Sequence, residues 1–357
     1  MNRHRTRPPL SRRMAVVGAG IAGLACARTL QRAGCDVQVF DAAPTPGGRL
    51  ATQDTPFGTF DTGAQYFTVR DARFTQVLQA TAVDVVRPWS ANAVRVLDEH
   101  GRVVEAALAA REAHWVAVPS MNRLPLRWAE PLQAAGALHL GAPVDRIAPG
   151  TADTPGWRLY VADASGQHRA HAGFDAVMLA LPSFQARQLL LKSEHSTPLT
   201  DRLAAVDVAP CWTLIMAFPH AAQPGLHTLG PQWNAARSTH HRVAWLARES
   251  SKPARALIER WTVQASAAWS REHQGDDPAR VTAKLLKAFG EITGIRAAPA
   301  FAEAHLWRQA QTLAPLGQPF VWDAAAGIGL CGDWCTGHRV EDAFVSGLEL
   351  ALRALDR

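Results

Sequence analysis

The glycine spacing Gly18-x-Gly20-x-x-Gly23 constrains the fold of this chain more than any other feature of its sequence. An apolar segment at 14–17 precedes it and predicts a buried strand, and the apolar periodicity of 21–33 predicts a helix. At such a strand–helix junction the first glycine permits the tight turn, the second lets backbone N–H groups approach a pyrophosphate, and the third lets the helix pack against the sheet. The spacing therefore predicts an α/β fold with a Rossmann-type dinucleotide site.

An acidic residue supports this interpretation. Residues 36–40 predict a second strand, and Asp41 follows it eighteen residues after Gly23, where a carboxylate can accept hydrogen bonds from an adenosine ribose. The apolar run after Arg12-Arg13 also imitates a twin-arginine signal peptide, but a signal has no use for the glycine spacing or the acid. We therefore expect residues 1–12 to be a disordered basic tail that precedes the fold.

The identity of the dinucleotide depends on two further segments. Gly48 and Arg49 lie shortly after Asp41 and offer flexible backbone and a guanidinium to a diphosphate. Near the C-terminus, 327–332 predicts another buried strand that ends at Gly332 and Asp333. An extended flavin dinucleotide needs such a second polar strand end and NAD does not, so the sequence predicts FAD.

Composition excludes several classes of protein. The 357 residues are 48% hydrophobic and 19% charged, which is typical of a globular chain, and the net charge of +6 is dispersed without a basic stripe. We expect no nucleic-acid partner and, without a run of eighteen apolar residues, no membrane span. The five cysteines form no disulfide framework and no zinc-type spacing, which predicts a reducing cytoplasm and no metal.

The order of predicted elements indicates two interleaved domains. We predict a discontinuous FAD-binding domain and a substrate domain rich in antiparallel strands. The FAD-binding domain comprises 13–75, 139–195 and 305–357, and the substrate domain comprises 76–138 and 196–304.

Longer segments of the chain resemble a known family. The residues Gly63-Ala-Gln-Tyr-Phe-Thr-Val-Arg70, Trp245-Leu-Ala-Arg-Glu-Ser-Ser-Lys-Pro253 and Cys331-Gly-Asp-Trp-Cys335, with Ser346-Gly347, resemble the bacterial renalases. The similarity runs in register from about Met14 to the C-terminus. These are flavoproteins of the monoamine oxidase and p-hydroxybenzoate hydroxylase fold group.

The resemblance implies an activity and a set of cofactor contacts. The implied reaction oxidises the 2- and 6-dihydro isomers of NAD or NADP to NAD(P)+ by hydride transfer to flavin N5, and O2 reoxidises the flavin to give hydrogen peroxide. The FAD is expected to be non-covalent. The implied FAD contacts are Ile21, Asp41, Arg49, Ala64, Gln65, Val144, Asp333 and Val340.

The resemblance also implies a set of residues that contact the substrate. The candidates are Tyr66, Phe67, Thr68, Val69, Arg70 and Arg339. Tyr66 and Phe67 are expected to wall the nicotinamide, while the two arginines are expected to meet carboxamide or phosphate oxygens. No catalytic acid or base is predicted, because oxidation of a dihydropyridine needs only an oriented ring.

Several alternatives remain open at this level. A flavin amine oxidase and a non-redox escort protein of the same fold are the competing functions. Gln264 stands where related sequences often place a histidine, so the preferred dihydro isomer is open. The oligomeric state is also open, with a homodimer possible. A thioether link from the flavin to Cys331 or Cys335 is a further alternative. His114, His240 and His241 show no metal-ligand or triad pattern and are expected to be structural.

Overall fold

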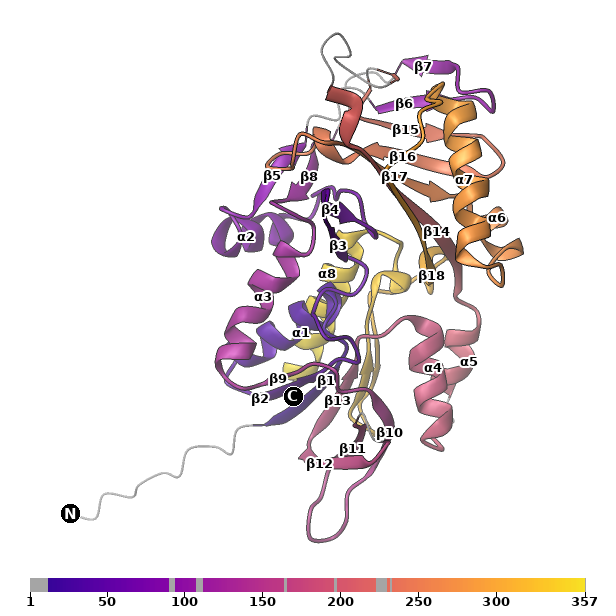
Figure 1. The fold of residues 1–357 in the computed structure, drawn as a ribbon. Helices are drawn as coiled ribbons and strands as arrows, with labels where there is room; N and C mark the ends of the chain where they lie inside the picture. Colours follow the sequence, from indigo (N-terminus) through magenta and orange to yellow (C-terminus); the bar gives the residue numbers. More distant parts are fainter. Residues whose placement is uncertain are drawn as a thin grey trace, which may run out of the picture.

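The computed structural model describes residues 12–89, 94–106, 112–163, 166–195, 198–222, 230–231 and 233–356. Two large sheets lie in separate halves of the molecule, with the C-terminus near the lower one (Figure 1). The expected disordered tail lies outside the described residues, except for Arg12, whose Nη1 donates to the carbonyl of Ala354 at 2.5 Å.

The first sheet has six strands and contains the predicted βαβ unit. All of its strand pairs are parallel except the β19–β20 pair. In spatial order it comprises β19 (Val321–Asp323), β20 (Ile328–Leu330), β13 (Ala176–Leu179), β1 (Arg13–Val17), β2 (Asp36–Phe40) and β9 (Leu138–His139).

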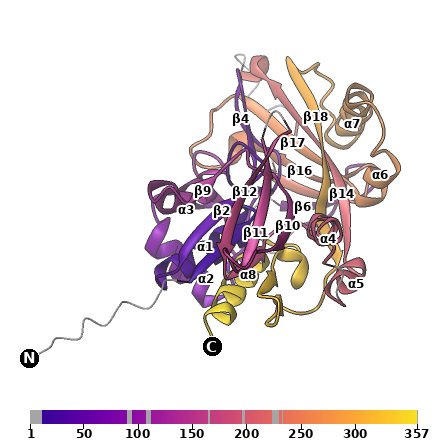
Figure 2. The same cartoon turned by 90° about the horizontal axis from the view of Figure 1, so that it is seen from below.

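Each face of this sheet is covered by a different layer. Successive side chains of β1 point to opposite faces, so they pack on different layers. Met14 and Val16 pack with the helical layer, whereas Ala15 and Val17 pack toward an antiparallel meander. The view from below shows β10–β12 crossing the sheet (Figure 2). The helices are α1 (Ile21–Arg32), α3 (Arg123–Ala134) and α8 (Val340–Leu355), and the meander is β10 (Val144–Pro149), β11 (Trp157–Ala162) and β12 (His168–Phe174).

The second sheet has seven strands, and its pairs are antiparallel except for β15 with β6. Its spatial order is β18 (Phe301–Ala314), β14 (Asp207–Phe218), β17 (Glu259–Ala265), β16 (Val243–Arg248), β15 (Ala235–Ser238), β6 (Val94–Leu97) and β7 (Val103–Ala106). The outer face packs on α7 (Pro278–Thr293), with α6 (Ala267–Glu272) beside it. The Asp277 side chain caps α7, and Gly294 ends it with a φ of 75°.

Shorter elements connect the two halves. The hairpin β3–β4 and the pair β5–β8 lie between the sheets in Figure 1. These connecting elements are β3 (Thr52–Thr55), β4 (Gly58–Asp61), α2 (Ala72–Thr81), β5 (Val86–Trp89), β8 (His114–Ala117), α4 (Ser183–Lys192), α5 (Pro198–Ala204) and the 3-10 turns η1 (Pro219–Ala222), η2 (Glu249–Ser251) and η3 (Asp333–Cys335).

The predicted α/β class with a Rossmann-type unit is confirmed. At two places the observed packing differs from the predicted domain limits. Helix α3 lies in the range predicted as substrate domain but packs on α1, because Leu124 and Trp128 supply apolar side chains to that layer. Strand β18 crosses the predicted limit at 305 and continues the second sheet to Ala314.

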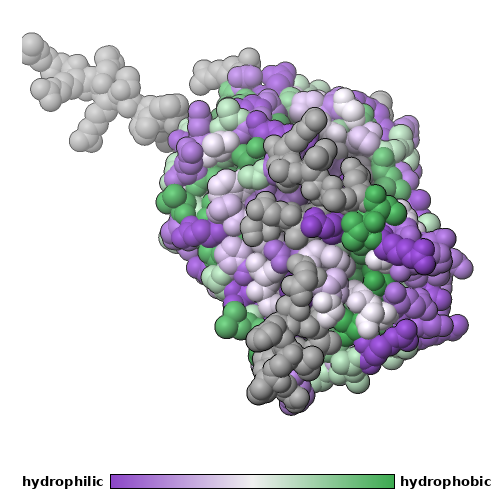
Figure 3. Space-filling view, turned by 90° about the horizontal axis from the view of Figure 1, so that it is seen from above, coloured by the Kyte–Doolittle hydropathy of each residue, from purple (hydrophilic) through white to green (hydrophobic). Residues whose placement is uncertain are grey.

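The surface carries only scattered large apolar side chains. Leu257 is 92% exposed and Val83 67% exposed, and they lie in different loops of the described chain. The face viewed in Figure 3 mixes hydrophilic and hydrophobic residues wherever atoms are coloured. Across the described residues, no helix has both the length and the hydropathy that crossing a bilayer requires.

Helices α1 and α8 cross in close contact at Gly347. A Cβ at this position would lie 2.0 Å from the carbonyl oxygen of Ala22 in the first turn of α1. The small residue therefore sets how closely the last helix approaches the glycine turn.

We predict that Gly347→Ala lowers stability by roughly 1–3 kcal/mol, because the added methyl group forces the two helices apart. Urea unfolding checks this value. Gly275→Ala is the matched control, since a Cβ there meets no atom within 4 Å. Equal stability of the two variants would contradict the close crossing.

Candidate functional site

The glycine turn has the geometry that phosphate binding requires. Gly18 has a φ of 106°, and a Cβ there would lie 2.3 Å from the Ala180 carbonyl oxygen. A Cβ at Gly23 would lie 1.8 Å from the Gly18 carbonyl oxygen, whereas one at Gly20 would meet nothing within 4 Å. Two glycines thus permit close packing and Gly20 borders open space at the N-terminus of α1, as the sequence predicts.

Asp41 and the loop at 47–48 complete this cradle. The Asp41 carboxylate accepts from the N–H groups of Ala19 at 2.5 Å and Ala43 at 2.8 Å, so it fixes the turn and still has lone pairs for a ribose. Gly47 N donates to the Ala19 carbonyl at 2.9 Å, and a Cβ at Gly48 would lie 3.5 Å from the Cα of Gly20. The cradle is therefore walled by backbone on both sides.

Two of the three charged residues predicted to contact the cofactor, Arg49 and Asp333, bind each other. Arg49 donates to Asp333 through two bonds, of 2.9 Å and 2.5 Å, and Arg49 also donates to the carbonyl of Ala310 at 3.0 Å. Asp333 is buried, and Gly332 before it is held by the Ser346 hydroxyl at 3.0 Å. The pair joins the strand end at β20 to the loop after the cradle.

The segment at 63–65 contacts both Arg49 and strand β17 of the second sheet. Ala64 N donates to the Arg49 carbonyl at 3.0 Å, and Gln264 Nε2 of β17 donates to the Gly63 carbonyl at 2.8 Å. The Gln65 side chain is buried and bonded within the protein, donating to the carbonyls of Asp61 and Gly63. Any cofactor contact of Gln65 therefore belongs to its backbone.

Tyr66 lies among aromatic rings from three elements. Its ring centroid is 4.2 Å from that of His114, 5.5 Å from that of Trp245 and 6.3 Å from that of Trp89. His114 was expected to be merely structural, and no motif in the sequence marks it. The cluster arises because β5, β8 and β16 bring their side chains to one point.

A row of side chains crosses the inner face of the second sheet beside Tyr66. Arg237, Trp245, Gln264 and Thr213 are direct partners on four neighbouring strands, so their side chains share one face. Trp245 packs with the core of the first half, whereas Leu246 packs toward α7. This row faces the predicted cofactor side, and sequence analysis singled out only Trp245 and Gln264 from it.

The predicted substrate segment 66–70 is fixed to the N-terminus of α8. The buried carboxylate of Glu341 accepts from the N–H groups of Arg70 and Asp71, both at 2.6 Å. The Arg70 guanidinium binds Glu112, with Nη2 to Oε2 at 2.8 Å. The hydrogen bond from Arg70 and the charges of Arg70 and Arg339 lower the pKa of Glu112, so both predicted arginines lie near that carboxylate.

The remaining predicted residues occupy supporting positions. Phe67 is buried beside Phe74, with ring centroids 5.9 Å apart, so it contributes to the core. Ile21 and Val340 are buried first residues of α1 and α8, and Val144 begins β10. Thr68 and Val69 are half-buried in the segment that Glu341 holds.

A buried ionic network joins the two halves behind this segment. Lys252 Nζ lies 2.9 Å from Asp61 Oδ2, 2.8 Å from Glu249 Oε1 and 3.1 Å from Gln65 Oε1. Arg255 Nη2 lies 2.7 Å from the same Asp61 oxygen. The side chains of all four charged residues are fully buried. The sequence gives no periodicity that marks this network.

The pKa values of the two acids in this network are shifted in opposite directions. Burial alone would raise the pKa of Asp61, but the charges of Lys252 and Arg255 outweigh it and lower the pKa below the ordinary value. Burial is the largest effect on Glu249 and raises its pKa, with the Asp61 charge acting in the same direction. Asp61 is therefore the firmly ionised partner of the two cations.

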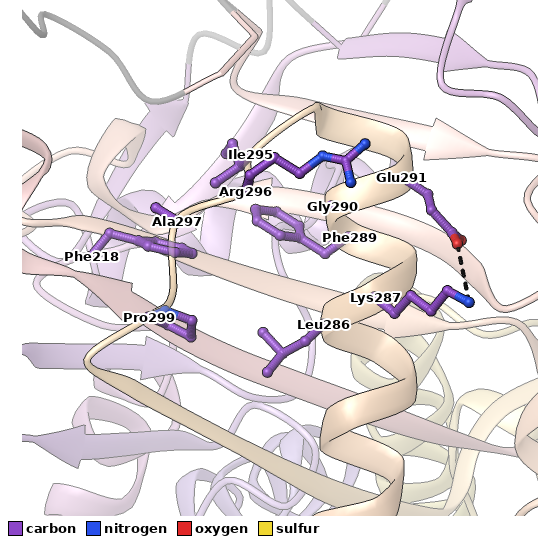
Figure 4. Close-up of a pocket in the computed structure, with 10 residues that line it drawn as sticks. All are labelled: Phe218, Leu286, Lys287, Phe289, Gly290, Glu291, Ile295, Arg296, Ala297 and Pro299. Carbon is purple, nitrogen blue, oxygen red and sulfur yellow. Dashed lines mark ion pairs between the residues drawn. The ribbon is translucent and has the colours of Figure 1, made fainter.

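The structure also has a pocket of about 320 Å³ on the far side of the second sheet. It lies between α7 and the loop before β18, and Figure 4 shows Phe218, Leu286 and Phe289 lining it beside Arg296. Leu286 and Phe289 lie on α7, and Phe218 lies on the sheet face that packs on α7, opposite the row that carries Trp245. The pocket is therefore separate from the candidate site.

Comparison with known proteins agrees with this arrangement. Residues 16–81 match the model of an NAD(P)-binding Rossmann-like domain. Residues 117–355 match the family model of flavin containing amine oxidoreductases, which covers most of the chain. The chain belongs to this family. The match to this family implies a flavin cofactor.

Solved structures of the family share the fold. A putative protoporphyrinogen oxidase from Exiguobacterium aligns with a TM-score of 0.73 at 14% identity, covering 97% of this chain and 99% of that one. Cyclohexylamine oxidase from Brevibacterium oxydans aligns with a TM-score of 0.69 at 14% identity, covering 96% and 98%. At these identities the likeness concerns the fold alone.

Curated relatives match over short segments of the chain. A hydroxyneurosporene desaturase from Cereibacter sphaeroides is 44% identical over 59 residues, which are 16% of this chain and 12% of the relative. The putative oxidoreductase UacF from Escherichia coli is 53% identical over 49 residues, 14% of this chain and 8% of that protein. The chain thus spans a small part of the length of these relatives.

Both cysteines near the strand end at Gly332 are buried thiols. Burial raises the pKa of Cys335 to about 12 and raises that of Cys331 well above its ordinary value. All five cysteines of the chain are free in the structure. Within the described residues, no group of three or more His, Cys, Asp or Glu side chains is placed to hold a metal ion.

We predict that Lys252→Met destabilises this flavoprotein by roughly 3–5 kcal/mol, because it leaves two buried carboxylates without their shared cation. Denaturant unfolding measures the change. Lys192→Met is the control, since its ion pair with Asp145 is exposed and should cost less than about 1 kcal/mol. A Lys252 variant as stable as the Lys192 variant would rule out a structural role for the network.

Proposed function

We propose that this protein is an FAD-dependent oxidase that converts the 2- and 6-dihydro isomers of NAD or NADP to NAD(P)+. The observation that carries the proposal is an unbroken series of contacts from Gly20 to Tyr66. It passes through Gly47, the Arg49–Asp333 pair and the Gly63–Gln264 contact. This series leads from the glycine turn to a cluster of aromatic rings around Tyr66.

FAD is proposed as the flavin because the residues at both ends of this series suit its two halves. The cradle around Gly20 and Gly48 would take the diphosphate, and Asp41 would accept the adenosine ribose hydroxyls. Asp333 and Arg49 would hold ribitol and diphosphate oxygens, and the backbone of Ala64 and Gln65 would border the flavin ring. Ile21, Val144 and Val340 would pack around it.

The proposed reaction needs orientation more than acid or base chemistry. A bound flavin supplies a hydride acceptor at N5 and passes two electrons to dioxygen. Overall, one dihydro substrate, one dioxygen and one proton give NAD(P)+ and hydrogen peroxide. Tyr66 supplies an aromatic wall for the nicotinamide ring, and Glu341 fixes the backbone that carries it.

Other parts of the proposal concern the state of the protein. We propose a non-covalent flavin, because both candidate thiols are protonated and buried and so lack nucleophilic character. Free cysteines throughout the chain suit a reducing cytoplasm.

The aromatic surroundings of Tyr66 also suit a second candidate, a flavin amine oxidase. Three rings around one tyrosine resemble a cage for an apolar amine. The exposed arginines Arg70 and Arg237 on either side favour an anionic dinucleotide instead.

We predict that the purified protein is yellow, that acid precipitation releases intact FAD, and that 2- or 6-dihydro-NAD(P) bleaches the flavin rapidly without oxygen. Rapid-mixing absorbance at the flavin bands measures this. Ordinary 4-dihydro NADH and amines should bleach it little. Fast bleaching by an amine alone would move the assignment to amine oxidation, and a flavin-free protein would refute both candidates.

A further inference from the structure

Two buried polar atoms next to Tyr66 have no hydrogen-bond partner. They are Nε1 of Trp245 and Nδ1 of His114. Trp245 is only 8% exposed and His114 is half-buried. A buried polar group without a partner costs free energy, so such atoms at a candidate binding site indicate a missing ligand.

The two atoms belong to rings that pack on the same tyrosine. The His114 and Trp245 centroids lie 4.2 Å and 5.5 Å from that of Tyr66. The buried indole of Trp89 in the same group differs, because its Nε1 donates to the Ser251 hydroxyl at 3.2 Å. Among the three rings around Tyr66, the buried polar atoms without a partner are thus one donor and one ring nitrogen.

The hydrogen-bonding roles of these two nitrogens limit the kinds of ligand group that can bind them. An indole nitrogen is a donor only, so Trp245 requires an acceptor. Burial is the largest effect on His114 and lowers its pKa, the Arg237 charge acts in the same direction, and Glu112 opposes it. The imidazole is therefore neutral near pH 7, and one of its nitrogens accepts a hydrogen bond.

Few ligand groups satisfy both requirements at once. With the His114 proton on Nε2, Nδ1 is an acceptor and a carboxylate offers it no donor, whereas the tautomer protonated at Nδ1 would donate to a carboxylate. An alkylammonium offers donors but no acceptor for the indole. A primary amide offers a carbonyl oxygen and an N–H group on adjacent atoms.

We propose that Trp245 and His114 recognise the carboxamide of the nicotinamide ring, with Trp245 Nε1 donating to the amide oxygen and His114 Nδ1 accepting from the amide N–H. This inference rests on the proposed oxidation of dihydronicotinamides and names the groups that select its substrate. It assigns His114 the tautomer protonated at Nε2. Tyr66 then walls the ring whose carboxamide the pair holds.

The test compares the dihydro isomers of NAD with those of its 3-acetylpyridine analogue, in which a methyl group replaces the amide nitrogen. Anaerobic flavin reduction gives the rate constant and the apparent Kd for each compound. The wild type should prefer the carboxamide by roughly tenfold, because the acetyl compound leaves His114 without its donor. His114→Phe should remove this preference, so that the ratio falls to about one.

Trp245→Phe should behave differently from His114→Phe. Both compounds keep the carbonyl oxygen, so both should lose affinity by a similar factor, roughly tenfold, while the ratio stays as in the wild type. The control is Trp212→Phe on the opposite face of the same sheet, whose indole already donates to the His273 carbonyl at 3.0 Å. It should change neither the ratio nor the Kd by more than about twofold.

The outcomes separate this inference from the proposed function. A wild type that no dihydro isomer reduces overturns both. A wild type that is reduced, with the same ratio in His114→Phe, overturns the carboxamide assignment alone. Should Trp245→Phe lose its flavin, the ratio in His114→Phe decides.

Discussion

The buried ion pair between Lys252 and Asp61 is the interaction on which the site depends. Asp61 ends the hairpin of the cofactor half, and Lys252 follows the fourth strand of the second sheet, so the pair ties the two halves together. With Glu249 and Arg255 it forms a fully buried network whose removal would leave uncompensated charge. Neither half can shift without breaking it, which fixes their relative position.

This constraint has a direct consequence for the residues between the halves. Gln65 binds Lys252 through its Oε1, so the network also fixes the segment that leads to Tyr66. Glu341 holds the other end of that segment at the start of α8. The tyrosine is thus clamped from both sides, which suits a reaction that depends on the orientation of two rings.

Local chemistry made one part of the molecule predictable from the sequence. The glycine turn, the helix at 21–33 and the strand at 36–40 depend on backbone sterics and short-range periodicity, and they appear where the residues indicate. The cradle at Gly20 and the position of Asp333 at a strand end follow from the same local rules. Such features need no knowledge of distant segments.

The rest depends on contacts between distant parts of the chain. The pairing of Arg49 with Asp333 joins residues 284 positions apart, and the Lys252 network joins residues 191 positions apart. His114 gained a place beside Tyr66 only because β8 pairs with β5 and approaches the second sheet. Helix α3 joined the cofactor half because of its apolar face, although its position in the sequence favoured the other domain.

A crystal structure of the oxidised protein with bound NAD+ would test the central claim, that the nicotinamide dinucleotide is substrate and the flavin is the resident cofactor. We expect the FAD diphosphate at Gly18–Gly23 and the nicotinamide ring beside Tyr66, with its carboxamide between Trp245 and His114. A nicotinamide dinucleotide whose diphosphate occupies the glycine turn, with Tyr66 free of ligand, would contradict the account.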